Sequence, residues 1–249
     1  MNTPRSIKRL GTSLLIGGQA VAATLRGRID RGELFEQLLE AGPGSVLIVL
    51  IISVAAGSVF NIQVAAELTR QGAGSTVGGI LAIGLAREIA PLLTACLLAG
   101  KVATAYAAQL GTMKVTEQID ALSTLSTNPY KYLVAPRLLA GFIMLPCCVL
   151  VADIIGVFGG YLISVHKLGF NPSVYIKNTW QFLEFIDVLS GLVKAAVFGF
   201  LIALMGCYHG YYSKGGAQGV GSATTNAVVS ASILILGFNY LITEAFFAR

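Results

Sequence analysis

The chain has 249 residues, of which 55% are hydrophobic and only 12% are charged. Soluble domains carry about 25% charged residues, so this composition excludes a water-soluble protein of ordinary surface and indicates an integral membrane protein. The length fits one membrane domain and leaves no room for a separate nucleotide-binding or catalytic domain of ordinary size. The net charge of +5 bears on orientation, because basic residues of membrane proteins concentrate on the cytoplasmic side.

The amino-terminal residues have the pattern of an amphipathic helix. Apolar residues recur at three- and four-residue steps from Ile7 to Ile29, with basic residues beside them. This spacing is helical. A basic amphipathic helix too polar to span a bilayer lies along the membrane surface, although a helix packed on loops of the same protein fits equally well. We assign residues 1–44 to this interfacial segment and residues 45–249 to the membrane domain.

Five long apolar runs follow, and about 20 apolar residues suffice to cross a bilayer core. The first run lies between Glu40 and Glu67, and the second, at 75–113, is interrupted by Arg87-Glu88 and Pro91. As one straight helix the second run would extend about 58 Å, so we expect it to bend near Pro91 or to project into water. The other three runs lie at about 138–165, 188–207 and 227–243. The sequence therefore predicts five transmembrane helices.

Basic residues predict the orientation of these helices. With the amino terminus in the cytoplasm, six basic residues precede the first span, four surround the connection between the second and third spans, and one follows the fourth. These eleven compare with four in the outer segments. The positive-inside rule therefore favours a cytoplasmic amino terminus.

The connection between the second and third spans predicts a short amphipathic helix. Thr116 can cap it, Glu117 and Asp120 lie near its positive amino-terminal end, and Ile119 and Leu122 share one face. Such a helix between two spans can dock into a groove of a partner and transmit force to both spans. An ordinary surface connector is the simpler interpretation of the spacing alone.

Four charged residues lie within the predicted spans, namely Arg87, Glu88, Asp153 and Lys194. A charge at this depth costs at least about 2.5–3.5 kcal/mol unless it is paired or hydrated. Adjacent residues of a helix point about 100° apart, so Arg87 and Glu88 should reach other helices, with Lys194 and Asp153 as the nearest candidates by depth. The four predict an intramembrane polar network, which either changes partners during transport or fixes the helix register.

Catalytic and metal-binding motifs are not found in the sequence. Gly100-Lys101 is followed by Val102 and does not complete a phosphate-binding loop. His166 and His209 have no metal-spaced partners, and the four cysteines form no metal or disulfide pattern. We therefore expect a transport subunit that is not an enzyme and binds no metal, cofactor or nucleic acid. Two alternatives remain: an ion-coupled secondary transporter that uses the four intramembrane charges, for which no inverted repeat is visible, and a structural scaffold.

The polar connection also carries a family resemblance. The segment Gln109–Leu122, followed by Asn128-Pro129, closely resembles the signature of MlaE-type permeases, the membrane subunits of ABC transporters that move phospholipids between membranes together with MCE-domain proteins. Further matches lie at 86–92, 153–160 and 219–225. The sequence departs from the family pattern at Gln109, where Glu is usual, and at Asn239, where many members have Asp.

The resemblance implies an all-α integral membrane fold with an amino-terminal interfacial helix, five transmembrane helices and a cytoplasmic coupling helix. It implies two copies of the chain per transporter, an ABC ATPase subunit that binds ATP, an MCE-domain lipid-binding protein and a phospholipid substrate. It also implies a multi-pass location in a bacterial inner membrane or a plastid inner envelope, with the amino terminus in the cytoplasm or stroma. Motion of the ATPase would pull the coupling helices and shift the first, second and fifth spans.

Two sets of residues would carry this function. The coupling helix, at about 116–122, would consist of Thr116, Glu117, Gln118, Ile119, Asp120, Ala121 and Leu122. A lipid carrier also needs an apolar cavity, and we expect its wall to come from apolar residues of the first two spans, namely Val59, Ile62, Leu81, Leu85, Leu92 and Leu93.

Overall fold

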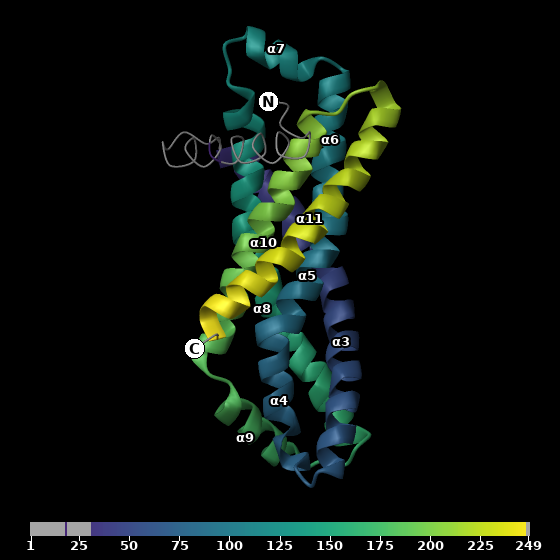
Figure 1. The fold of residues 1–249 in the computed structure, drawn as a ribbon, viewed down its shortest axis with the longest axis vertical. Coiled ribbons are helices and arrows are strands. Elements are labelled where there is room, and N and C mark those ends of the chain that lie inside the picture. Colours follow the sequence, from purple (N-terminus) through teal and green to yellow (C-terminus); the bar gives the residue numbers. More distant parts are fainter. Residues whose placement is uncertain (1–17, 19–30, 248–249) are drawn as a thin grey trace, which may run out of the picture.

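The structure, a computed structural model, describes Gly18 and residues 31–247, so the helix predicted over 7–29 lies outside the described residues. Every regular element of the described residues is helical, which confirms the all-α class (Figure 1). Five helical segments are long and apolar enough to cross a membrane, as predicted. They are 31–70, 74–115, 130–166, 185–211 and 216–247.

The first span has a break near its start. Helix α2 (Arg31–Ala41) and helix α3 (Pro43–Arg70) are joined at Gly42. A side chain at this position would fall on the terminal methyl group of Met144 in the third span, so the methionine would have to move to admit it. Helix α3 thus begins at Pro43, where proline suits the first turn because its missing N–H has no helical partner.

The second span is one continuous helix in which two π turns interrupt the α-helical hydrogen bonding. With a preceding short 3-10 turn, η1 (Gly74–Thr76), it has 42 residues, or about 63 Å at helical rise, and exceeds a bilayer core of about 30 Å. The irregularity expected near Pro91 takes the form of a π turn directly before it, and a second π turn has no counterpart in the sequence analysis. Its parts are α4 (Val77–Gly84), η2 (Leu85–Ile89), α5 (Ala90–Leu98), η3 (Ala99–Ala103) and α6 (Thr104–Val115).

The remaining spans pack around α10 (Phe185–Tyr211), which has buried residues along most of its length. Helix α8 (Ala135–His166) crosses α10 where Gly141 and Gly199 bring the two backbones into contact. Close backbone approach at small residues is a common basis of helix association in membranes. Helix α11 (Gly216–Phe247) packs on α6 and α10 and begins eleven residues before its predicted start.

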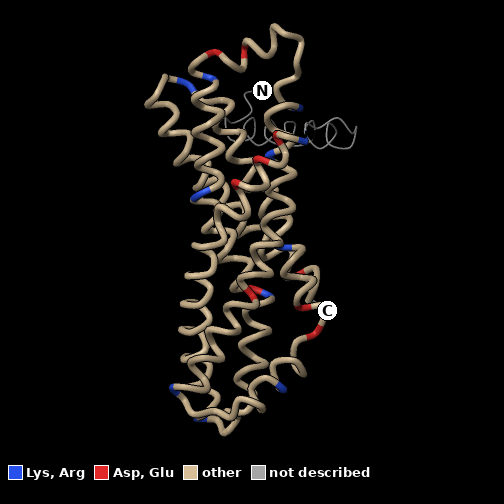
Figure 2. The backbone as a smooth tube through the Cα atoms, turned by 180° about the vertical axis from the view of Figure 1, so that it is seen from behind, with Lys and Arg blue, Asp and Glu red and all other residues tan. Residues whose placement is uncertain are grey.

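Two short helices mark the two ends of the molecule. Helix α7 (Gln118–Thr124) and the π turn η4 (Tyr130–Val134) connect α6 to α8 at one end, called here the α7 end. Helix α9 (Pro172–Phe182) connects α8 to α10 and packs on α4 at the opposite, α9 end (Figure 1). Charged residues gather at these two ends, with a small group between them (Figure 2). The fold therefore offers two polar regions for a functional site, one at the α7 end and one within the spans.

Candidate functional site

The predicted coupling helix forms, but two residues later than expected. Helix α7 covers 118–124 rather than 116–122. The prediction that Thr116 caps it was wrong, because the Thr116 hydroxyl instead donates to the carbonyl of Thr112 and closes α6. Glu117 has a left-handed backbone with φ of 60° and makes the turn between the two helices.

One face of α7 is attached to the spans and the other is free within the described chain. Ile119 is 1% exposed and belongs to the main core, and Leu122 packs beside it, as their shared face predicted. The Asp120 carboxylate accepts from Lys114 of α6 at 2.8 Å. The predicted residues Glu117, Gln118, Asp120 and Ala121 are all exposed. Helix α7 therefore presents a polar surface outward while its inner face is held by the core and α6.

The far side of the α7 connection is tied to α10 by tyrosines. The ring of Tyr130 stacks on Tyr211 with centroids 4.9 Å apart, and its hydroxyl lies 3.3 Å from that of Tyr212. Burial and this hydrogen bond raise the pKa of Tyr212 to about 12, so Tyr212 stays un-ionised near neutral pH. The sequence analysis missed this joint, although Tyr208, Tyr211 and Tyr212 form a visible aromatic run at the end of the fourth span.

Within the spans, Glu88 of η2 is the centre of a hydrogen-bond network. Its carboxylate accepts from Lys194 of α10 at 2.6 Å, as predicted, and from Asn239 and Thr243 of α11 at 3.0 and 2.9 Å. Lys194 also donates to the carbonyl of Arg87 at 2.8 Å. Pro91, four residues further on, has no N–H to offer that carbonyl, so the lysine compensates for the proline.

The partner of Arg87 is Asp187, which the sequence analysis did not select. The two groups are 2.6 Å apart, and the ring of Phe247 covers the guanidinium at 4.1 Å from its centroid. Asp187 lies in the first turn of α10, where its carboxylate also accepts from the backbone N–H of Glu184. The fourth span was predicted to begin at Val188, one residue too late to include this acid.

Asp153 does not join the network, and its predicted role there was wrong. One of its carboxylate oxygens is buried without a hydrogen-bond partner, and both cations of the network are already paired with Glu88 and Asp187.

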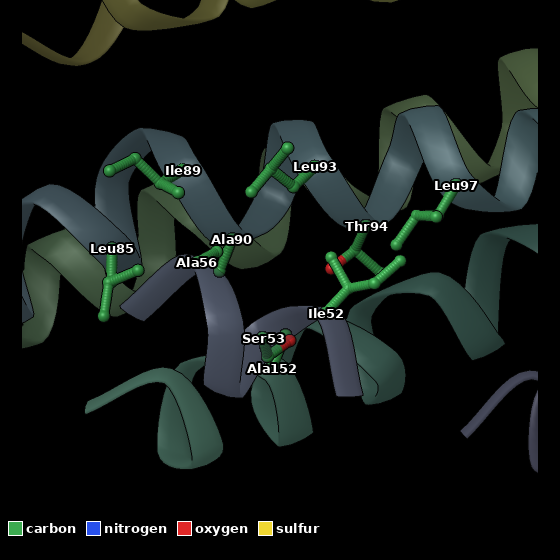
Figure 3. Close-up of a pocket in the computed structure, with 10 residues that line it drawn as sticks. All are labelled: Ile52, Ser53, Ala56, Leu85, Ile89, Ala90, Leu93, Thr94, Leu97 and Ala152. Carbon is green, nitrogen blue, oxygen red and sulfur yellow. The ribbon is translucent and has the colours of Figure 1, made fainter. Parts of the chain in front are cut away.

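Only two of the six predicted cavity residues share a depression. Leu85 and Leu93 line a narrow groove between α3, α5 and α8 with a volume of about 10 Å³, together with residues such as Ile52 and Ala152 (Figure 3). This is room for about one water molecule. Leu81 is fully buried, and Leu92 packs against the main core. Val59 and Ile62 are exposed on α3. The six residues therefore do not enclose an acyl chain within one copy of the described chain.

Comparison with known proteins assigns the class. Residues 34–245 match the family described as Permease MlaE. The chain belongs to the MlaE permease family. The permease is 48% identical over 245 residues to a probable ABC transporter permease protein of Rickettsia conorii, covering 98% of this chain and 95% of the relative. It is 42% identical over 240 residues to a probable ABC transporter permease protein of Synechocystis, covering 96% and 91% of the two chains.

A plant protein is also similar to this permease. The chloroplastic protein TRIGALACTOSYLDIACYLGLYCEROL 1 of Arabidopsis thaliana is 35% identical over 233 residues, covering 94% of this chain and 67% of the relative. The family resemblance drawn from the sequence is thereby confirmed. The protein is a multi-pass permease subunit of an ABC transporter, which implies an ATPase partner.

The two amides at which the sequence was expected to depart from the family pattern, Asn239 and Gln109, have a common geometry. Asn239 donates its amide N–H to Glu88, and Gln109 donates its amide N–H to Glu40. A carboxylate at either position would face another carboxylate instead of donating to it. The amide at each position therefore donates to a carboxylate that an acidic residue at the same position would repel.

Proposed function

We propose that this permease moves phospholipids, driven by ATP hydrolysis on a separate ABC ATPase subunit that docks on α7. The observation that carries the proposal is the arrangement of α7, whose outer residues are free to bind a partner while its inner residues are fixed to the spans. The family membership supports the ATPase, and a relative named after a glycerolipid supports a lipid substrate.

The attachments of α7 give a route for force. The Lys114–Asp120 pair joins α7 to the second span, and the Tyr130–Tyr211 stack joins the same connection to the fourth span. Deeper in the spans, Glu88 links the second, fourth and fifth spans through Lys194 and Asn239. A displacement of α7 therefore acts on the second and fourth spans together, and on the fifth through Glu88.

The polar network also supports a lipid head-group site. The side chains of Arg87 and Glu88 are 34% and 39% exposed, whereas their partners Asp187 and Lys194 are fully buried. Each pair thus holds one charge at the surface of an otherwise apolar bundle. Because the groove lined by Leu85 and Leu93 is too small for an acyl chain, we place the lipid cavity between two copies of the permease. An MCE-domain protein would receive or deliver the lipid at the α9 end.

We also propose an orientation in the membrane, which the same arrangement supports. The α7 end would face the cytoplasm or stroma, where ATP is available, in agreement with the distribution of basic residues. The host membrane would be a bacterial inner membrane or a plastid inner envelope, since the relatives include bacterial and chloroplastic proteins.

The experiment uses the permease reconstituted in vesicles with its ATPase and MCE-domain partners, with ATP hydrolysis and transfer of a fluorescent phospholipid measured in parallel. The test variant is Glu117→Lys, because Glu117 is exposed and, unlike Asp120, is not paired with Lys114. We expect lipid transfer to fall at least about tenfold, the loss that corresponds to about 1.4 kcal/mol of docking energy. The matched control is Glu36→Lys, the same charge reversal at an exposed residue of α2, outside both α7 and α9.

The outcomes separate the candidates. Loss of transfer in Glu117→Lys with normal transfer in Glu36→Lys supports docking at α7. Normal transfer and normal ATP hydrolysis in Glu117→Lys would contradict it. Lipid movement by the permease without the ATPase, driven by an ion gradient, would favour the ion-coupled alternative.

A further inference from the structure

Helix α2 carries its polar face toward the protein and its apolar face outward. Glu33, Gln37 and Glu40 follow one another at spacings of four and three residues, which places them on one side of the helix. Gln37 is 4% exposed, whereas Phe35 and Leu39 on the other side are 63% and 48% exposed. A helix on a soluble protein would show the opposite pattern. Something in the interior must therefore satisfy the polar face of α2.

The interior groups that contact its two carboxylates, Glu33 and Glu40, are Arg137 of α8 and Gln109 of α6. The amide nitrogen of Gln109 donates to the two carboxylate oxygens of Glu40 at 3.1 and 3.3 Å. The amide oxygen of the same side chain accepts from the Arg137 guanidinium at 3.1 Å. Arg137 is 4% exposed and lies 3.8 Å from the carboxylate of Glu33. One amide thus joins three helices.

Only a side chain that both donates and accepts can make this bridge. A carboxylate at position 109 would pair with Arg137 but repel Glu40, because it has no N–H to donate. An apolar side chain would leave both Glu40 and Arg137 without this partner, in a region where unpaired polar groups are costly. The glutamine at this position therefore has a specific role in linking α2 to the helices beside it.

We propose that Gln109 is a positioning residue that fastens α2 to α6 and α8, so that α2 moves with the two helices that carry α7. The role of this clamp in transport rests on the proposed function, whereas the clamp itself rests on the contacts of Gln109 alone. Helix α2 leads directly into α3, so the clamp extends the motion of α7 to the first span, which neither the Lys114–Asp120 pair nor the tyrosine joint reaches.

The test is a charge swap, followed by hydrogen–deuterium exchange of the full-length permease in lipid nanodiscs. Gln109→Glu should release α2 but keep the contact between α6 and α8, because the new carboxylate still pairs with Arg137. We expect amide exchange within 31–41 to rise at least about tenfold, since a hydrogen bond to a charged group shifts a local opening equilibrium by that factor or more. The double variant Glu40→Gln with Gln109→Glu reverses donor and acceptor and should return exchange to within about twofold of the wild type.

The same variants are then compared in the reconstituted transporter as phospholipid moved per ATP hydrolysed. We expect this ratio to fall several-fold in Gln109→Glu and to recover in the double variant. A merely structural role would give the exchange changes without a change in the ratio, and that result would overturn the role in transport. Wild-type exchange in Gln109→Glu, or no recovery in the double variant, would overturn the clamp. A wild-type complex that hydrolyses ATP without moving lipid would instead refute the proposed function. The role of the clamp in transport would then fall as well. The exchange data would still test whether Gln109 holds α2 in place.

Discussion

Asn239→Asp changes a donor of the network around Glu88 into an acceptor. In the wild type the amide nitrogen of Asn239 lies 3.0 Å from the Glu88 carboxylate. Two carboxylates at that separation repel by about 5 kcal/mol at an effective dielectric constant of about 20. Protonating one carboxyl of ordinary pKa near 4 costs about 4 kcal/mol at pH 7, so a repulsion weaker than this is borne at neutral pH and relieved by a proton only at lower pH.

Exposure of Glu88 to solvent reduces the magnitude of this repulsion. The Glu88 side chain is 39% exposed, and Lys194 stays beside it at 2.6 Å. Because screening weakens the repulsion, we expect a loss of about 2 kcal/mol in the free energy of unfolding at pH 7. For a chain of this size, that corresponds to a fall of roughly 4–8 °C in the midpoint of thermal unfolding.

The assay is the thermal midpoint of the detergent-solubilised permease between pH 5 and pH 8, compared with Asn239→Leu. The repulsion makes the folded Asp variant bind a proton more readily than its unfolded state does, so its deficit should be full near neutral pH and shrink toward pH 5, where the proton is taken up. Asn239→Leu loses the hydrogen bond without adding a titrating group, and its deficit should not change with pH. A deficit in Asn239→Asp that is equally independent of pH would refute the reasoning.

Two further variants test the packing and the ion pairs by the same thermal assay. Gly199→Ala places a methyl group on the carbonyl of Gly141 and should lower the free energy of unfolding by about 1–3 kcal/mol. Gly237→Ala, with open space around it, should not lower the midpoint, because alanine favours a helix more than glycine does. Equal midpoints for the two variants would contradict the close crossing of α8 and α10. Lys194→Met leaves Glu88 without its cation and should lower the free energy of unfolding by about 3 kcal/mol. Adding Glu88→Gln should recover most of that loss, because no unpaired charge then remains. A double variant as unstable as Lys194→Met alone would show that the two residues do not act as a pair.

The sequence predicts the spans well because a bilayer requires about 20 apolar residues in each, whatever their order. It predicts their ends less well. Helix α11 begins at Gly216 although Ser222, Thr224 and Asn226 suggest a loop, since a helix satisfies its own backbone and tolerates such residues beside α6 and α10. The start of α10 was placed after Asp187 for the same reason, and a true partner of Arg87 was missed.

The partners of buried charges show a second limit to what can be predicted from the sequence. Depth along a helix can be counted from the sequence, and it correctly placed Lys194 beside Glu88. Depth also suggested Asp153, but this residue pairs with neither cation of the network, and one of its carboxylate oxygens is buried without a hydrogen-bond partner. Rotation of one helix against another depends on contacts such as Gly57 against Gly156, which appear only in the folded structure.

The contacts between spans bear on how the permease moves. Backbone contacts at Gly57 and Gly156 join the first span to the third, and those at Gly141 and Gly199 join the third to the fourth. The two ion pairs join the fourth span to the second, and Glu88 adds the fifth. Closely packed backbones do not slide gradually, because any displacement must break the packing. We therefore expect each copy to move largely as one body when α7 is displaced, so that a lipid cavity opens and closes between two copies rather than by the separate shift of the first, second and fifth spans expected from the sequence.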